Sequence, residues 1–324
     1  MLNLIIYLLV FSGFSIEIGN GDDSEIIVRD LEEFFKYKRT DFGSVSELKF
    51  DEKGYLGGGG NVIVWKGNYN GTLVAIKVVY DLIKMEREVA VLEKLEATTN
   101  PNIEIAGIPR VYWHGKMLDS HQGIAMTLFE RTLFNVYKDI LKKRALLEID
   151  VLQIFKQAVG ILKYLNEKTV IHNDIKPDNI FFHFDLASID GSKAIGGTSK
   201  FASANFHAHR QSTPMDDLVS LIYSLWHVSG IKLGELDEFG TNQDEGKIME
   251  KLSPMEAKDR VQKKNSHFKD PHVREVFTFV CEHEWLTGKS VPNYDLIIKK
   301  STDAFNRLHK WSSFEWTVQS LPRL

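Results

Sequence analysis

Three polar residues close together in the chain have the types and spacing that phosphoryl transfer requires. Asp174 can accept the proton of an attacking hydroxyl, Lys176 can neutralise a phosphate, and Asn179 can ligate a metal ion. Enzymes catalyse this reaction almost entirely by positioning and charge stabilisation, so these three groups in one short segment are sufficient for its chemistry. A polar surface loop would contain the same residue types and is the alternative on this segment alone.

A second group of residues, earlier in the chain, is suited to phosphate binding. Four consecutive glycines begin at Gly57, and glycines, which lack a Cβ atom, let backbone amides approach a phosphate closely, although a flexible turn would look the same. Lys77 ends a Val-Ala-Ile-Lys segment and can reach the phosphates of a nucleotide. Its ammonium needs an acidic partner, for which Glu88 is our candidate, with Glu86 and Glu93 as alternatives.

Hydrophobic periodicity indicates which elements must position these groups. Short β-rich segments broken by glycine run from about residue 48 to 77, and a helical stripe follows over 83–95. From residue 149 onward, apolar residues recur at helical spacing and lead into the segment with Asp174. Asn70-Gly71 is typical of a tight turn between two strands, which we favour over a glycosylation acceptor. The pattern predicts a small mixed part followed by a larger, mainly helical part.

Composition and charge exclude several classes of protein. The chain has 324 residues, of which 43% are hydrophobic and 26% charged, so it can bury a large core. Its 40 basic and 44 acidic side chains give a net charge of −4, which offers no attraction to nucleic acid or to an anionic membrane surface. The single cysteine, Cys281, excludes an internal disulfide framework, and we expect it in the core.

The N-terminal region contains an apolar run over 4–15 that is too short to span a bilayer, so no stable membrane span is predicted. Small residues at its end are typical of a secretory signal peptide over 1–15. No Lys or Arg precedes the run, so a buried strand in a cytoplasmic protein, or an extension without a role, is the alternative.

The N-terminal extension, 16–47, follows this run. Part of it, 22–38, mixes acidic residues with apolar ones at a spacing that predicts an amphipathic helix docked on another surface. Its apolar residues include Ile26, Ile27, Leu31, Phe34 and Phe35.

The segment from His172 to Asn179 reads H-N-D-I-K-P-D-N and resembles the catalytic loop of protein kinases, H-R-D-x-K-P-x-N in the serine/threonine enzymes. The resemblance implies that Asp174, Lys176 and Asn179 are catalytic residues. Asn173 stands where the family has Arg. Because that arginine pairs with a phosphorylated residue of the activation segment, its replacement implies activity without this switch.

The same resemblance implies a nucleotide site with ATP and Mg²⁺ as cofactors. Gly57 and Gly59 match the first two glycines of the G-x-G-x-x-G loop that covers the phosphates, whereas Val62 occupies the third glycine position. Lys77 and Glu88 match the ion pair that holds the nucleotide. The valine puts the affinity for nucleotide in question.

The hinge and the second metal ligand complete this implied site. Met126 and Leu128 belong to the stretch that would contact adenine. The D-F-G motif, whose Asp shares Mg²⁺ with Asn179, does not occur after Asn179, where the family has it. We prefer Asp190 as this ligand because its distance from Asn179 leaves room for a hairpin of two strands. The alternative aligns His183-Phe184-Asp185 with D-F-G, places His at the metal position and leaves only three residues for that hairpin.

Two further segments resemble the casein kinase 1 group. The stretch 107–115 looks like a strand of that group, and 197–205 carries its G-T-x-x-Y/F-A-S-x-N string, followed by D-D-L-x-S-L at 216–221. By this resemblance Asp217 anchors the catalytic loop backbone, although a helix N-cap after Pro214 would read the same way. The resemblance implies a bilobal α+β fold, with a β-rich N-lobe and hinge over 48–129 and a mainly α-helical C-lobe over 130–324.

These features predict a serine/threonine protein kinase that transfers the γ-phosphate of ATP to a protein hydroxyl. A catalytically impaired pseudokinase that acts as a binding scaffold is the first alternative, because of Val62 and the altered D-F-G. A phosphotransferase acting on a small molecule such as choline is the second. The expected partner is accordingly a protein substrate or a scaffold partner.

Overall fold

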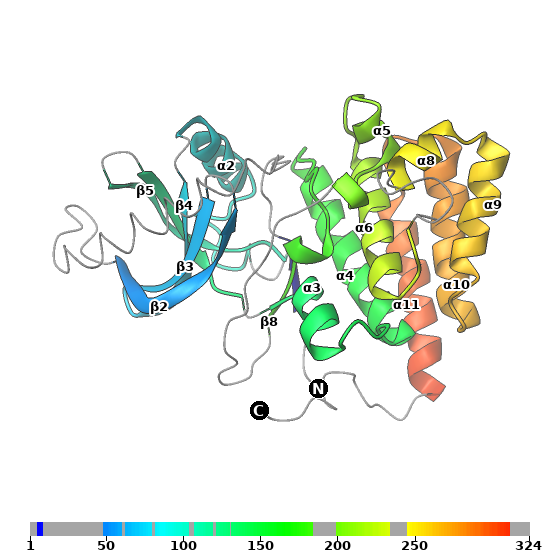
Figure 1. Cartoon of the computed structure of the whole chain (residues 1–324), viewed down its shortest axis with the longest axis horizontal. Coiled ribbons are helices and arrows are strands. Elements are labelled where there is room, and N and C mark those ends of the chain that lie inside the picture. The colour runs from blue at the N-terminus through cyan, green and yellow to red at the C-terminus, as the bar shows by residue number, and fades with distance from the viewer. Residues whose placement is uncertain are drawn as a thin grey trace. The chain divides into compact units, whose positions relative to one another are not determined.

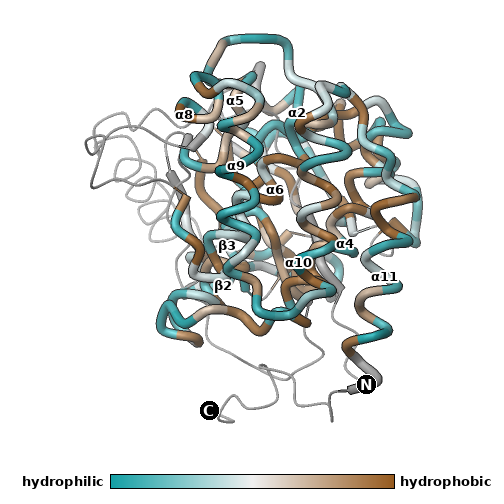
Figure 2. Tube along the Cα trace, turned by 90° about the vertical axis from the view of Figure 1, so that its right-hand side faces the viewer, coloured by the Kyte–Doolittle hydropathy of each residue, from teal (hydrophilic) through white to brown (hydrophobic). Residues whose placement is uncertain are grey.

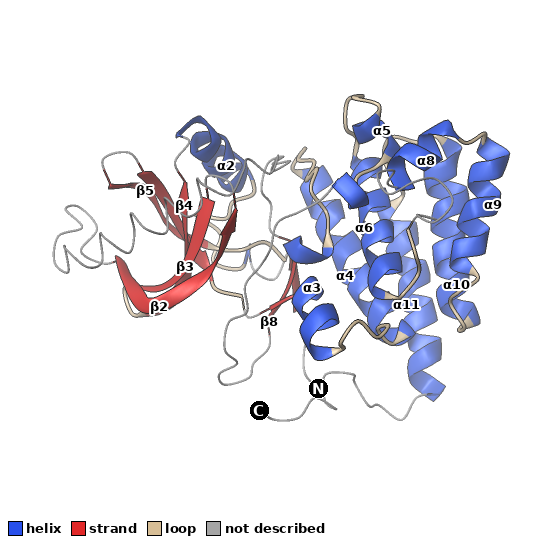
Figure 3. Ribbon diagram, in the orientation of Figure 1, coloured by secondary structure: helices blue, strands red, loops and turns tan. Residues whose placement is uncertain are grey.

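The computed structural model describes residues 5–8, 48–59, 62–79, 82–103, 107–118, 121–129, 131–183, 199–233 and 245–311. The chain divides into two compact units. Unit 1 comprises Met1–Thr132 and Phe181–Gly197, and unit 2 comprises Leu133–Ile180 and Thr198–Leu324. Strands predominate in unit 1 and helices in unit 2 (Figure 3). The predicted α+β architecture is confirmed.

Unit 1 contains a five-stranded antiparallel sheet in the order β2-β3-β4-β6-β5 (Figure 1). Its strands are β2 (Leu48–Gly59), β3 (Val62–Tyr69), β4 (Thr72–Val79), β5 (Val111–Leu118) and β6 (His121–Thr127). Asn70 and Gly71 connect β3 to β4 with φ angles of 49° and 86°. Two successive residues with positive φ form the tight turn that matches strand twist, so the predicted hairpin is confirmed.

Helix α2 (Leu82–Lys94) is the one α-helix among the described residues of unit 1. It packs beside β4 and β6 (Figure 1). Met85, Glu88 and Leu92 are buried and recur at intervals of three and four residues, so they form one stripe of the helix. This spacing turns Glu88 inward with the apolar residues.

A smaller sheet in unit 1 has the order β1-β8-β7. It is formed by β1 (Ile5–Leu8), β7 (Arg131–Thr132) and β8 (Ile180–His183). The backbone of β8 pairs with β7, with Arg131 opposite Phe182, which explains why Phe181–Gly197 groups with unit 1. The structure divides the chain at Thr132, whereas the sequence placed the boundary after residue 129. The strand alternative for the N-terminal apolar run corresponds to β1.

Unit 2 is built from helices packed around one core. They are α3 (Leu133–Asn135), α4 (Glu148–Glu167), α5 (Ala204–His207), α6 (Pro214–Val228), α8 (Glu245–Lys251), α9 (Pro254–Asn265), α10 (Pro271–Phe279) and α11 (Tyr294–Trp311). Short π-helical turns span Val136–Ile140 and Val280–Glu284, and short 3₁₀ turns span Pro177–Asn179, Ser199–Phe201 and Trp285–Thr287.

Helix α6 lies at the centre of unit 2. Nearly all its residues are buried, including Tyr223 and Trp226 at 0% exposure, and Figure 2 shows it largely in the hydrophobic colour. Helix α4 packs against both α6 and α11. Cys281 is also fully buried, which confirms its predicted place in the core. Among the described residues, no helix combines the length and apolar character needed to cross a membrane.

Substitution by alanine should have opposite effects on stability at two glycines. A Cβ atom at Gly67 in β3 would meet the Lys49 carbonyl oxygen and the Ile76 side chain, whereas one at Gly160 in α4 meets no atom within 4 Å outside its own helix. Gly67→Ala should lower the free energy of unfolding by about 1–3 kcal/mol through overpacking. Gly160→Ala should raise it by about 0.5–1 kcal/mol through helix propensity. Urea denaturation measures both, and equal effects would contradict the packing described for β3.

Candidate functional site

Unit 1 contains one group of candidate functional residues, a buried ion pair. Nζ of Lys77 on β4 lies 2.6 Å from Oε2 of Glu88 on α2, and both side chains are almost completely buried. Glu86 is exposed, and Glu93 lies near exposed His114 at 3.9 Å, so neither alternative partner is placed to replace Glu88. The predicted Lys77–Glu88 pair is therefore present, and its role in holding a nucleotide stays a prediction.

Burial dominates the electrostatics of this pair. It lowers the pKa of Lys77 and raises the pKa of Glu88, because a low-dielectric environment disfavours both charges, while each partner partly offsets this effect for the other. Oε1 of Glu88 has no hydrogen-bond partner among the described residues. The carboxylate thus retains a buried acceptor, which is costly unless another donor uses it.

The sheet register places further side chains around Lys77. Val64 lies directly opposite Lys77, and Met126 lies directly opposite Ala75, so all four share one face of the sheet. Met126 is buried, and Leu128 follows the strand with a half-buried side chain. The sequence analysis did not predict that Val64 and Ala75 lie on the same face as Lys77. The two-residue alternation of a strand, applied to Val-Ala-Ile-Lys, would have placed Ala75 there.

The glycine segment belongs to the β2–β3 hairpin. Gly57 is paired with Val64 and Gly59 with Val62, and Gly57 has a φ of 153° at a β-bulge. This backbone conformation favours glycine. Val62 on β3 pairs with Val79 on β4. The residue at the third glycine position is therefore part of the regular sheet. Residues 60 and 61 lie outside the described residues.

Unit 2 contains a second group of candidate functional residues, on a loop held by a buried carboxylate. Oδ2 of Asp217 accepts a hydrogen bond from the His172 backbone N–H at 2.7 Å, and Oδ1 accepts one from the Asn173 N–H at 2.8 Å. Asn173 has a φ of 63°, a left-handed conformation that asparagine tolerates better than most residues. This pair of bonds is the backbone anchor that the sequence predicted for Asp217.

The beginning of α6 explains why Asp217 is free for this task. Thr213 caps the helix, and the Asp216 carboxylate accepts hydrogen bonds from the Thr213 N–H and hydroxyl, each at 2.7 Å. Asp216 therefore performs the capping function that was the alternative for Asp217. Asp217, one residue later on the helix, points its carboxylate at the loop.

The loop presents Asp174 in a restrained position. Its Oδ2 atom accepts hydrogen bonds from Lys176 Nζ and from Asn179 Nδ2, each at 2.8 Å. Asn179 Nδ2 also donates to the Asp174 carbonyl oxygen at 2.8 Å, and the Asp174 N–H donates to Nδ1 of buried His172 at 3.1 Å. Oδ1 of Asp174 accepts no hydrogen bond from the described residues, and the side chain is 23% exposed. A partly exposed acceptor on a fixed carboxylate can receive a proton.

Comparisons with known proteins agree with this geometry. The family model of the protein kinase domain matches residues 36–192. The chain is 21% identical to a probable casein kinase I homolog of Encephalitozoon cuniculi (strain GB-M1) over 310 residues, which cover 85% of this chain and 95% of that relative. It is 25% identical to a probable serine/threonine-protein kinase of Fowlpox virus (strain NVSL) over 249 residues, 70% of this chain and 81% of the relative.

A solved structure shares the fold. The structure of vaccinia related kinase 3 aligns with a TM-score of 0.60 at 14% identity and covers 91% of this chain and 99% of that one. The family model and the two relatives support the eukaryotic protein kinase superfamily, and the solved structure shows that the fold is shared. The conclusion agrees with the resemblance carried by the His172–Asn179 segment.

The predicted kinase residues fall into two groups, one in each unit. Unit 1 joins Lys77 to Glu88, and unit 2 joins Asp174 to Lys176 and Asn179. The loop also contains Asp178, which the sequence prediction left out. Burial raises the pKa of Asp178 to about 6, partly offset by Lys176.

The predicted metal site lies only in part among the described residues. The nitrogen of the Asn179 side-chain amide donates both of its hydrogen bonds. The amide oxygen, which is the atom suited to bind Mg²⁺, takes part in neither of them. Asp190, the predicted second ligand, and Asp185 lie outside the described residues, while His183 of the alternative alignment belongs to β8. Within the described ranges no cluster of three or more His, Cys, Asp or Glu residues could hold a metal.

The buried pair predicts a non-additive response to mutation. Glu88→Ala removes the carboxylate that offsets the burial of Lys77 and should lower the free energy of unfolding by about 3–5 kcal/mol. The double substitution Lys77→Met and Glu88→Leu should recover most of this loss, because it leaves no buried charge. Urea denaturation measures each variant. Exposed Glu86→Ala is the matched control, with an expected change within about 0.5 kcal/mol. A double variant no more stable than Glu88→Ala would contradict the pairing.

The raised pKa of Asp217 should make the stability of the protein depend on pH. Burial raises this pKa to about 7 from 3.8, against the opposing effect of the two backbone hydrogen bonds. The folded protein therefore binds a proton between these pH values that the unfolded chain has released, and the contribution of Asp217 to the free energy of unfolding falls as the pH rises from about 4 to about 7.

This dependence can be measured by denaturant titrations across pH. The native chain should lose stability relative to Asp217→Asn as the pH rises from about 4 to about 7, and the difference should become constant above that range. Parallel curves for the two proteins over the whole range would show that Asp217 does not titrate in this way.

Proposed function

We propose that the chain is a serine/threonine protein kinase that transfers the γ-phosphate of ATP to a hydroxyl of a protein substrate. The observation that supports this most directly is the restrained Asp174 carboxylate, which has one oxygen bound by Lys176 and Asn179 and the other without a bond to the described residues. A general base needs this combination of fixed orientation and a free acceptor.

In the proposed reaction, Asp174 accepts the proton of the substrate hydroxyl as that oxygen forms its bond to the γ-phosphorus. The bond between the γ-phosphorus and the oxygen bridging to the β-phosphate breaks, and ADP is the leaving group. Lys176 lies 2.8 Å from Asp174 and is placed to neutralise charge on the transferred phosphoryl group. Lys77, oriented by Glu88, would bind the α- and β-phosphates of the nucleotide.

Magnesium would neutralise the phosphate oxygens and orient them when bound. Asn179 and Asp190 are the residues that would hold it. Asn179 suits this role because its amide oxygen lies outside the two bonds made by its nitrogen. The same two bonds fix the amide plane and therefore the direction in which that oxygen points.

A binding scaffold without phosphate transfer is the second candidate function. Two observations favour it: Val62 stands in the regular sheet where the family has a third glycine, and no Asp-Phe-Gly follows Asn179 in the chain. A side chain at that glycine position would restrict how closely the hairpin backbone approaches phosphates. The two candidates differ in whether the chain binds ATP and turns it over.

Phosphate transfer in the presence of Mg²⁺ distinguishes these functions. The purified full-length chain should transfer labelled γ-phosphate from ATP to casein, and Asp174→Asn should lower the rate by about 10²–10⁴-fold because the proton acceptor is lost. The exposed Asp259→Asn substitution on α9 makes the same chemical change away from the site and should keep the native rate.

The other outcomes identify the alternatives. A thermal shift with ATP that is retained in Asp174→Asn would show that the variant lost chemistry and kept binding. The absence of any thermal shift with ATP, with or without Mg²⁺, would support the scaffold. Labelling of choline and not of casein would favour a small-molecule phosphotransferase.

A further inference from the structure

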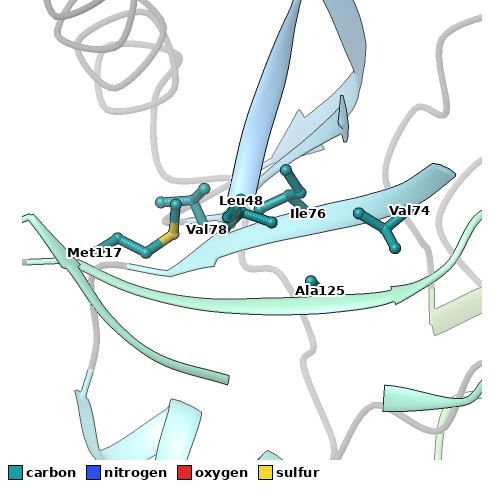
Figure 4. Packing of buried hydrophobic residues seen from close by; sticks show 6 residues of the cluster. All are labelled: Leu48, Val74, Ile76, Val78, Met117 and Ala125. Atoms are coloured by element: carbon teal, nitrogen blue, oxygen red, sulfur yellow. The ribbon is translucent and has the colours of Figure 1, made fainter. Parts of the chain in front are cut away.

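The sheet of unit 1 has a second apolar face, on the side opposite Lys77. Six buried residues form its centre (Figure 4). Four partly buried aromatic residues pack against them. The buried residues are Leu48, Val74, Ile76, Val78, Met117 and Ala125, and the aromatic ones are Phe50, Tyr69, Tyr112 and Trp113. We refer to these ten residues as the aromatic face.

The register separates this face from the candidate nucleotide site. Val74, Ile76 and Val78 alternate along β4 with Ala75 and Lys77, so the two sets leave the sheet in opposite directions. Glu88 of α2 reaches Lys77, and α2 is the one α-helix described in unit 1. Among the described residues, then, α2 serves the Lys77 side, and the aromatic face has no helix assigned to it.

Two glycines leave room on this face for the side chains of neighbouring residues. A Cβ atom at Gly123 would meet the Met117 side chain, and one at Gly115 would come within 3.2 Å of the Trp113 ring. These two side chains can therefore lie flat against the sheet backbone. A broad apolar surface with partly exposed rings is the type of surface that another apolar element covers.

The chain contains a segment with matching chemistry in 22–38. These residues lie outside the described part of the structure, so their match to the aromatic face is argued from their sequence. On a helical projection, Ile26, Ile27, Leu31, Phe34 and Phe35 fall within about half of the circumference, with Val28 at its edge and Asp30 as a charged residue on the same side. Glu25, Arg29, Glu32 and Lys36 fall on the other half. Such a segment gains stability only when its apolar side is covered.

The connection and the dimensions favour this segment as the cover. After β1, the described part of unit 1 resumes at Leu48, which is itself a member of the aromatic face. The residues between 38 and 48 can span up to about 30 Å when extended. A helix over 22–38 would be about 25 Å long, and a sheet of five strands is about 19 Å wide, so one helix can cross the face.

We propose that residues 22–38 of the same chain form a helix that docks its apolar side on the aromatic face. Phe34 and Leu31 would contact the rings of Tyr69, Tyr112 and Trp113, and Lys36 would face solvent. Docking on this face would stabilise the sheet that carries Lys77 from the side opposite the nucleotide. The same surface could instead bind a second copy of the chain, and the experiment separates the two occupants.

Site-specific photo-crosslinking tests the contact directly in the full-length chain. A benzophenone amino acid replaces Phe34 in one variant and Lys36 in the matched control, and crosslinked peptides are identified by mass spectrometry. Position 34 should crosslink to peptides that contain Tyr69, Tyr112 or Trp113, and position 36 should not. Mixing heavy- and light-isotope chains distinguishes contacts within one chain from contacts between copies.

The proposal is overturned if position 34 crosslinks elsewhere, if positions 34 and 36 give the same products, or if the products join heavy to light chains. Thermal unfolding supplies an independent measurement. Phe34→Asp should lower the melting temperature by roughly 4 °C and Lys36→Asp should leave it unchanged, because only the first places a charge in the contact. Equal effects of the two substitutions would also contradict the docking. These readouts do not depend on phosphate transfer.

Discussion

The two hydrogen bonds accepted by the Asp217 carboxylate are the interaction on which the His172–Asn179 loop depends. The carboxylate extends from α6, the most buried helix of unit 2, and each of its oxygens receives a backbone N–H of the loop. A buried carboxylate is costly unless it is hydrogen-bonded, so the loop must adopt the conformation that offers both N–H groups. The left-handed conformation of Asn173 is part of that requirement. The position of Asp174 thus follows from the core of unit 2.

Unit 1 uses a similar constraint in a different form. Lys77 and Glu88 lie on separate elements, and burial disfavours the charge on each, so each charge depends on the other element staying in place. In both units the groups assigned to chemistry are therefore held by buried polar contacts that tolerate little displacement. The aromatic face on the other side of the sheet contributes no charge and depends on packing.

Several features of the fold and site were predictable because they depend on residues close in sequence. The Asn70-Gly71 turn, the helix with Glu88 and the strand after Asn179 each carry a local signal of turn chemistry or periodicity. The family resemblance pointed to Asp217 as the loop anchor, but local sequence signals alone did not separate it from Asp216, because two adjacent aspartates at a helix start fit either role until the loop is placed beside them. The grouping of β8 with unit 1 likewise depends on its pairing with β7 across the chain.

The sequence by itself determined the family resemblance and the order of the chemical groups, because the spacing of Asp174, Lys176 and Asn179 and the Val-Ala-Ile-Lys segment are local properties of the chain. Only the tertiary structure decided which carboxylate pairs with Lys77, which aspartate binds the loop, and which sheet residues share a face with Lys77. These outcomes depend on contacts between residues distant in sequence, whose energies come from burial and from hydrogen bonds that exist only after the elements pack.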